Sequence, residues 1–186
     1  MVYNVYIKRS DIMDKIIFKK LDGSVLQYKK IYEWCSMPFV YKYFEQRKLS
    51  YDEIVNKYKK RLRKNAHTKT FIINYNDFDI GIIQYSKVLM DDIRRFKLYE
   101  YGECYQLDIF IGDKNYLNKG IGTQVLCKMI RWLEEEYGYN CFVAFIESEN
   151  IGSIKCFNKL GFVLYKEFRQ NDSLGVKSDY SLVIKK

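Results

Sequence analysis

Two closely spaced glycines stand where backbone amides could hold an anion. Gly120 and Gly122 lie in the segment Leu117 to Thr123, at the start of a long amphipathic pattern. The first amides of a helix lack partners and lie at the positive end of the helix dipole, and glycine lets an anion come close to the backbone. The segment therefore predicts a pyrophosphate site. The expected binding residues are Lys119, Gly120, Ile121, Gly122 and Thr123.

Known phosphate motifs do not account for this segment. No Gly-Lys-Ser or Gly-Lys-Thr ending follows a first glycine at the Walker A spacing. The dinucleotide fingerprint needs a third glycine or alanine where Val125 stands. One alternative therefore stays open, that the two glycines only shape a loop-to-helix turn.

A single carboxylate interrupts an otherwise apolar strand just before this segment. Asp108 lies between Leu107 and Ile109 in a predicted strand from Tyr105 to Ile111. A charge in such a place is costly unless it is paired or functional. Because side chains alternate along a strand, Asp108 could also point to solvent, opposite to its apolar neighbours.

The elements that must position these residues follow from periodicity, turns and caps. Ser24 and Ser50 are predicted helix caps, the second with Glu53 as a capping box. Apolar residues recur at helical spacing from Gly120 to Tyr137, and Gly138 ends that helix. Strands are predicted at Ile16 to Leu21, Phe71 to Tyr75, Ile80 to Val88, Tyr105 to Ile111, Cys141 to Ile146, Phe162 to Phe168 and Val176 to Ile184. The order predicts a mixed α/β or α+β domain on one central sheet.

Composition narrows the class of protein. A chain of 186 residues without an internal linker predicts a single domain, 1–186. Five cysteines without a CxxC pair, and His67 as the one histidine, favour reduced thiols in the cytoplasm and no metal site. The net charge of +9 is scattered along the chain, so nucleic-acid binding is not favoured. No apolar run is long enough for a membrane span.

A second segment completes a family pattern. Asn150 to Phe162 reads Asn-Ile-Gly-Ser-Ile-Lys-Cys-Phe-Asn-Lys-Leu-Gly-Phe. Together with Leu117 to Thr123, it resembles the two signatures of the GNAT-type N-acetyltransferases, which are a Gly-x-Gly loop and Asn-x-x-Ala-x-x-x-Tyr-x-x-x-Gly-Phe. The stretch from Tyr105 to Thr123 is similar to the aminoglycoside 6′-N-acetyltransferases within that superfamily.

The resemblance implies a fold, a cosubstrate and residue roles. The GNAT fold has a mixed central sheet that is splayed between its two central strands and flanked by helices. Acetyl-CoA would be the cosubstrate, bound by a signature region from about 105 to 168. Its pantetheine would pair with the backbone of Phe110 and Ile111, and its pyrophosphate would lie on the Lys119 to Thr123 amides. Asn150 and the helix after it would face the coenzyme arm.

Three residues depart from the family pattern. Leu117 replaces the usual Gln or Arg, and Ser153 replaces Ala. Phe157 stands where a tyrosine often gives a proton to the departing thiolate, and a phenyl ring has no donor. Phe157 would then only contact the coenzyme, and Cys156 or Tyr116 or water would supply the proton.

The acceptor is expected to be a small primary amine, most simply the 6′-amine of an aminoglycoside. Asp108 would take the amine proton. Trp34 could pack on a sugar ring or a cation, or belong to the core. An acidic cleft could draw on Asp91, Asp92, Glu100, Glu103 and Glu147, of which Glu147 is the candidate substrate contact. The alternatives are another amine, a peptide N-terminus or a non-catalytic coenzyme-binding module, as a monomer or homodimer.

Overall fold

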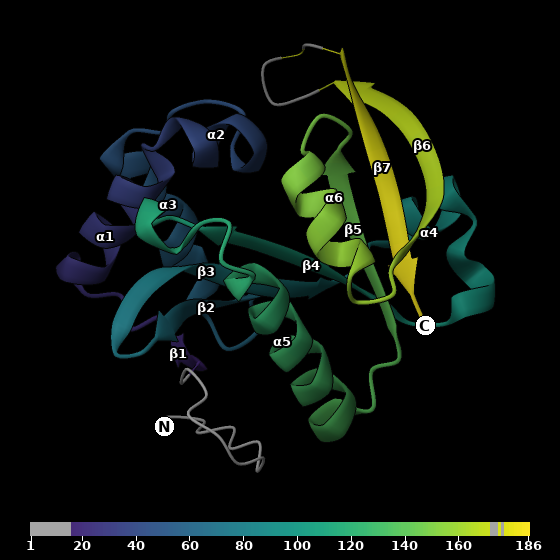
Figure 1. Ribbon diagram of the computed structural model, residues 1–186, viewed down its shortest axis with the longest axis horizontal. Helices are drawn as coiled ribbons and strands as arrows, with labels where there is room; N and C mark the ends of the chain where they lie inside the picture. Colours follow the sequence, from purple (N-terminus) through teal and green to yellow (C-terminus); the bar gives the residue numbers. More distant parts are fainter. Residues whose placement is uncertain (1–15, 172–174, 176) are drawn as a thin grey trace.

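The described residues form one mixed sheet with helices on both faces (Figure 1). The computed structural model describes residues 16–171, 175 and 177–186. Its sheet has seven strands in the order β1-β2-β3-β4-β5-β7-β6. Their bounds are β1 (Ile16–Lys20), β2 (Thr68–Tyr75), β3 (Phe78–Lys87), β4 (Cys104–Ile111), β5 (Cys141–Glu147), β6 (Val163–Asn171) and β7 (Lys177–Lys185). Val176, the predicted first residue of the last strand, lies outside the described residues.

The helices include two that the sequence did not predict. The helices are α1 (Val25–Cys35), α2 (Pro38–Phe44), α3 (Tyr51–Arg61), α4 (Met90–Phe96), α5 (Ile121–Tyr137) and α6 (Ile151–Asn158), with short 3-10 turns at Leu98–Tyr101 and Lys114–Tyr116. The predictions missed α2 and α4, which have only seven residues each and so show little periodicity. Pro38 at the first turn of α2 was the available signal, because proline is favoured there. None of the described helices is long and apolar enough to cross a membrane.

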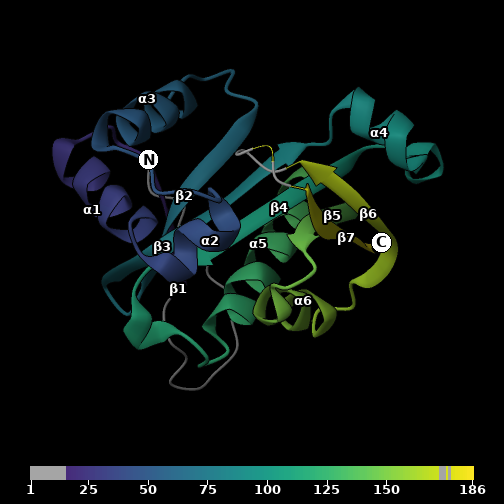
Figure 2. The ribbon, with the colours of Figure 1, turned by 90° about the horizontal axis from the view of Figure 1, so that it is seen from above.

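Alternation along the central strands creates two different faces. Ile72, Ile82 and Phe110 pack against α1, α2 and α3. The apolar residues next to them in the same strands point to the other face and pack against α5. Helix α4 covers the first of these faces further along the sheet, where it packs near Val143 and Leu182. Seen from above, α1 to α4 therefore lie on one side of the sheet, and α5 and α6 lie on the other (Figure 2).

The sheet opens between its two central strands, as the GNAT resemblance implied. Parallel pairing of β4 with β5 covers only Cys104 to Gln106 against Cys141 to Val143. Beyond this point β4 stays paired with β3 up to Ile111, and β5 stays paired with β7 up to Glu147. The expected mixed sheet, splayed at its centre and flanked by helices, is confirmed.

Helix α5 begins and ends on glycines in left-handed conformations. Gly120 has φ +75° and Gly138 has φ +68°, and such positive φ values favour residues without a Cβ. Between them, Val125, Met129 and Leu133 are fully buried on one side of the helix. The predicted bounds of this helix are confirmed, so its first turn lies directly after the β4 loop.

The predicted capping box at Ser50 is present and gives a stability prediction. Ser50 Oγ accepts from the Glu53 amide at 3.3 Å, and Glu53 Oε2 accepts from the Ser50 amide at 2.8 Å. We expect Ser50→Ala to lower the free energy of unfolding by about 1 kcal/mol, which corresponds to a Tm lower by about 2–4 °C in a protein of this size. Thermal unfolding measures this, with the exposed Lys48→Ala as a control expected to change Tm little. Equal Tm values for both variants would contradict the cap's contribution.

Candidate active site

A cavity of about 710 Å³ occupies the opening between β4 and β5. Residues of α2, β4, the start of α5, β5 and α6 line it. The structure brings together most of the side chains and backbone that the sequence predicted for the site, namely Asp108, Phe110, Ile111, Gly120, Ile121, Gly122, Thr123, Glu147, Asn150 and Phe157. Lys119 does not line the cavity, because its side chain is exposed beside the loop.

The first turn of α5 offers amides to this cavity. The first bond within the helix runs from the Gln124 amide to the Gly120 carbonyl at 3.2 Å. The amides before Gln124 therefore have no partner four residues back in the helix. A Cβ placed on Gly122 would meet only the Cys156 sulfur, at 3.5 Å, so a larger side chain there would extend into the cavity. This end of α5 has the open approach that an anion needs.

Helix α6 forms the other side of the cavity. Asn150 caps it, because its Oδ1 accepts from the Ser153 amide at 3.1 Å. Lys155 and Lys159 bring positive charge to the same lining. Phe157 is buried, with its ring 4.9 Å from that of Phe162 and nearly perpendicular to it. Phe157 is therefore an apolar part of the lining.

Cys156 and Tyr116, the two alternatives to a tyrosine at 157, also line the cavity. The Cys156 sulfur lies 3.2 Å from the Thr123 hydroxyl oxygen. Burial raises the pKa of the Cys156 thiol, against a smaller opposing effect of the Thr123 hydrogen bond. Cys156 is therefore a protonated thiol at neutral pH.

Asp108 is half-buried and lies on the face of the sheet that α1 to α3 cover. Both of its oxygens accept from Gln106 Nε2 at 3.1 Å, and Oδ2 accepts from Gln84 Nε2 at 3.4 Å. Burial raises the pKa of Asp108 above its usual value, whereas these hydrogen bonds and the charges of Arg61 and Lys57 lower it. Asp108 lies on the opposite face from Leu107 and Ile109, as strand alternation predicted, and on that face it lines the cavity.

Glu147 ends β5 at the same cavity and is held by residues that the sequence did not indicate. Its Oε1 accepts from Gln46 Nε2 at 2.8 Å and from the Tyr180 hydroxyl at 3.4 Å. Gln46 follows α2 and Tyr180 belongs to β7, so the three residues come from distant parts of the chain. Such a cluster leaves no local pattern in a sequence.

The end of the cavity near α2 combines carboxylates with aromatic rings. Phe39, Tyr43 and Phe44 of α2 line it, together with Glu149 after β5. Of the five acidic residues that the sequence offered for a cleft, Glu147 is the one that lines this cavity. Asp91 and Asp92 lie instead in the first turn of α4, and Glu100 and Glu103 are exposed near β4's start. Anionic and aromatic groups together suit a cationic amine.

Trp34 belongs to the core and not to the cavity lining. Its side chain is 3% exposed, and its ring centroid lies 6.4 Å from that of Phe110. A Cβ on Gly112 would overlap the Trp34 ring, so the indole fills the space that this glycine leaves. Substrate contact by Trp34 is therefore corrected to core packing beneath the end of β4.

This placement predicts separate effects of a Trp34 substitution on stability and on substrate affinity. We expect Trp34→Phe to lower the free energy of unfolding by about 1–3 kcal/mol, because it leaves a cavity in the core. The KM for an amine substrate should change less than about twofold, because the buried side chain does not line the cavity. Thermal unfolding and steady-state kinetics check both quantities. A large rise in KM with an unchanged Tm would restore the substrate role.

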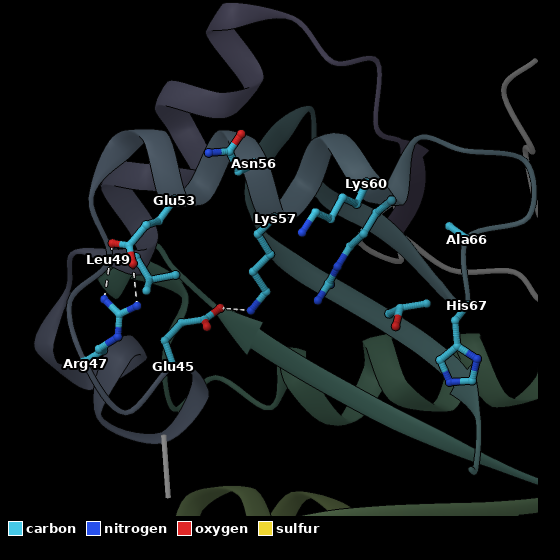
Figure 3. A pocket seen from close by; sticks show the side chains of 11 residues that line it. Glu45, Arg47, Leu49, Glu53, Asn56, Lys57, Lys60, Ala66 and His67 are labelled. Carbon is cyan, nitrogen blue, oxygen red and sulfur yellow. Dashed lines mark hydrogen bonds and ion pairs between the residues drawn. The ribbon is translucent and has the colours of Figure 1, made fainter. Parts of the chain in front are cut away.

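A second cavity of about 600 Å³ lies between α3 and the start of β2 (Figure 3). Cations and carboxylates there are largely paired with one another. Lys57 donates to Glu45, and Arg47 Nη2 lies 2.5 Å from Glu53 Oε1. Lys60 and the predicted exposed His67 also line it. Among the described residues, no group of three or more His, Cys, Asp or Glu side chains could hold a metal ion.

Comparison with protein families decides the family. The family described as Acetyltransferase (GNAT) domain matches residues 21–163. The chain belongs to the GNAT acetyltransferase family. The match begins just after β1 and ends at the first residue of β6, and so includes the splayed strands β4 and β5, the start of α5 and helix α6.

Solved GNAT-like structures share the fold at low sequence identity. An uncharacterized protein from Bacillus halodurans is 18% identical, with a TM-score of 0.79 over 93% of this chain and 84% of that chain. RimL, a ribosomal L7/L12 α-N-protein acetyltransferase in complex with coenzyme A, is 12% identical, with a TM-score of 0.73 over 91% and 93%. AAC(6′)-Ib in complex with paromomycin and acetyl-CoA is 14% identical, with a TM-score of 0.71 over 91% and 92%. At these identities the likeness concerns the fold.

Proposed function

We propose that this GNAT protein transfers the acetyl group of acetyl-CoA to a primary amine of a polycationic small molecule, the 6′-amine of an aminoglycoside. One observation carries the proposal: a single cavity joins the open first turn of α5 to Asp108 and Glu147. Its one end suits a diphosphate, and its other end suits a cationic amine. AAC(6′)-Ib, which shares the fold, was solved with an aminoglycoside and acetyl-CoA bound.

The coenzyme would be bound by backbone groups more than by side chains. The amides of Ile121, Gly122 and Thr123 would bind its diphosphate, and Lys155 would add charge from α6. The β5-facing edge of β4 beyond Gln106 has no strand paired with it among the described residues. Such an edge can accept an extended ligand as an added strand. These residues fit acetyl-CoA, which supplies an activated acetyl group when bound.

Asp108 would make the amine nucleophilic. Amines of the lysine type have a pKa of about 10 and are mostly protonated at neutral pH. In the proposed reaction Asp108 receives one proton from the protonated amine, the neutral nitrogen bonds to the acetyl carbon, and the bond from that carbon to sulfur breaks. The second proton that the nitrogen loses is released to water. The departing thiolate takes its proton from Cys156, Tyr116 or water. Glu147, Glu149 and the α2 rings would hold the remaining positive charges of the acceptor.

A substrate panel tests this proposal. Release of free coenzyme A thiol is followed with kanamycin-like aminoglycosides, linear polyamines and short peptides with free N-termini. We expect kcat/KM for the aminoglycosides to exceed that for the peptides by at least about 10²-fold, because only polycations can pair with several carboxylates. Acetylation of peptides alone would reassign the acceptor to a protein N-terminus. Binding of acetyl-CoA without turnover of any amine would indicate a non-catalytic module.

A further inference from the structure

A row of polar side chains crosses the sheet beside Asp108. Thr70 of β2 pairs in register with Gln84 of β3, and Gln84 pairs in register with Asp108 of β4. Thr70 is 7% exposed and Gln84 is 5% exposed. Burying a side-chain amide costs free energy unless its donors and acceptors form hydrogen bonds. The hydrogen-bonding partners of Gln84 therefore indicate its role.

Arg61, the last residue of α3, fixes the orientation of the Gln84 amide. Its Nη1 donates to Gln84 Oε1, and to Thr70 Oγ1 at 3.1 Å. The Tyr58 ring supports the guanidinium, whose central carbon lies 5.0 Å from the ring centroid. Arginine has only donors, so the amide oxygen of Gln84 must face it. The amide nitrogen then necessarily points the other way, to Asp108 Oδ2 at 3.4 Å.

We propose that Arg61 and Gln84 are positioning residues for acetyl transfer, in which Arg61 orients the Gln84 amide and the amide holds Asp108 as a carboxylate facing the acceptor amine. This inference rests on the proposed function. It adds two residues that lie outside the cavity lining between β4 and β5. Gln106 holds the same carboxylate from its own strand, so Gln84 supplies the donor from the neighbouring strand.

Several other groups could affect the protonation of Asp108. The charges of Arg61 and Lys57 of α3 act on Asp108 and lower its pKa. The other charged and titratable side chains on the same cavity are those of Tyr43, Tyr116, Glu147, Glu149, Lys155, Cys156, Lys159 and Tyr180. Lys57 donates to Glu45, and Glu147 accepts from Gln46 and Tyr180. Of the cations, Arg61 is the one joined to Asp108 through a shared hydrogen-bonding partner.

The pH dependence of kcat/KM tests the proposal in the full-length protein. The variants are Gln84→Met, which keeps side-chain length without the amide, and Arg61→Gln, which removes the guanidinium. Lys60→Gln is the matched control, because it removes one charge from the adjacent, exposed position. A base accepts a proton only when it is deprotonated. Loss of a hydrogen bond or charge that stabilises the Asp108 carboxylate raises its pKa, and the acidic limb of the kcat/KM profile then moves to higher pH. We expect Gln84→Met to move its midpoint up by about 1 unit, Arg61→Gln by at least about 0.5 and Lys60→Gln by less than about 0.2.

The double variant Arg61→Gln, Gln84→Met tests whether Arg61 acts through Gln84 or independently of it. If Arg61 acts through Gln84, the midpoint of the acidic limb moves up in the double variant by less than the sum of the shifts in the two single variants. A merely structural role would lower Tm or the high-pH plateau and leave the midpoint in place. An unmoved midpoint in folded Gln84→Met and Arg61→Gln would overturn the proposal.

A measurement without substrate keeps the proposal distinct from the proposed function. The carbon-13 shift of the Asp108 carboxyl, assigned by its loss in Asp108→Asn, is followed against pH in each variant. The same upward midpoint shifts are expected there even if no amine is turned over. Equal midpoints in wild type and Gln84→Met would overturn the positioning role, whereas absent turnover with shifted midpoints would reject only the enzymatic proposal.

Discussion

Replacing Asp108 with asparagine is expected to lower kcat/KM for the acceptor amine by about 10²–10⁴-fold, the usual contribution of a positioned base. The amide has the size of the carboxylate and can keep partners among the neighbouring glutamines, but it cannot take a proton from the amine. The Kd for acetyl-CoA should change less than about twofold, because the α5 amides are untouched. Steady-state kinetics and calorimetric titration with acetyl-CoA measure the two quantities.

The residual activity of Asp108→Asn should also depend on pH in a particular direction. Without a base, the neutral fraction of the free amine limits the rate, so activity should keep rising toward the amine pKa of about 10. Asp113→Asn is the matched control, since Asp113 lies just after β4 and caps the Lys114–Tyr116 turn outside the cavity lining. Activity of Asp108→Asn within about threefold of wild type would remove Asp108 from the chemistry.

A second large effect is expected from filling the first turn of α5. Gly122→Val should weaken acetyl-CoA binding by at least about 10²-fold, because a branched side chain would occupy the approach to the amides. The Cys156 sulfur lies 3.5 Å from the position of the new Cβ, which leaves the rest of the side chain to extend into the cavity. Thermal-shift titration with acetyl-CoA reads the affinity directly, since ligand binding raises the apparent stability.

Helix stability provides the control for this variant. Valine is a slightly better helix residue than glycine, so Gly122→Val without ligand should have a Tm at or above that of wild type. Gln124→Val places the same residue two positions later, on the exposed side of α5, and should leave acetyl-CoA affinity unchanged. Normal binding by Gly122→Val would mean that the diphosphate does not lie on these amides, and the proposed position of the coenzyme would be wrong.

Much of the architecture could be predicted from local signals in the sequence. The capping box at Ser50, the apolar repeat between Gly120 and Gly138, and the run at Cys141 each depend on neighbours within a few residues. All three are elements of the structure. The short helices α2 and α4 escaped prediction because seven residues give fewer than two full periods for a pattern to repeat.

The sequence by itself determined the family pattern, and it indicated the start of α5 as a candidate anion site and Asp108 as the carboxylate to examine. Only the tertiary structure decided which way Asp108 points, that Trp34 fills the space beside Gly112, and that Glu147 meets Gln46 and Tyr180. The physical reason is one of range. Caps and periodicity are set by residues a few positions apart, whereas the contacts of Glu147 join residues 33 and 101 positions apart and exist only once the chain has folded.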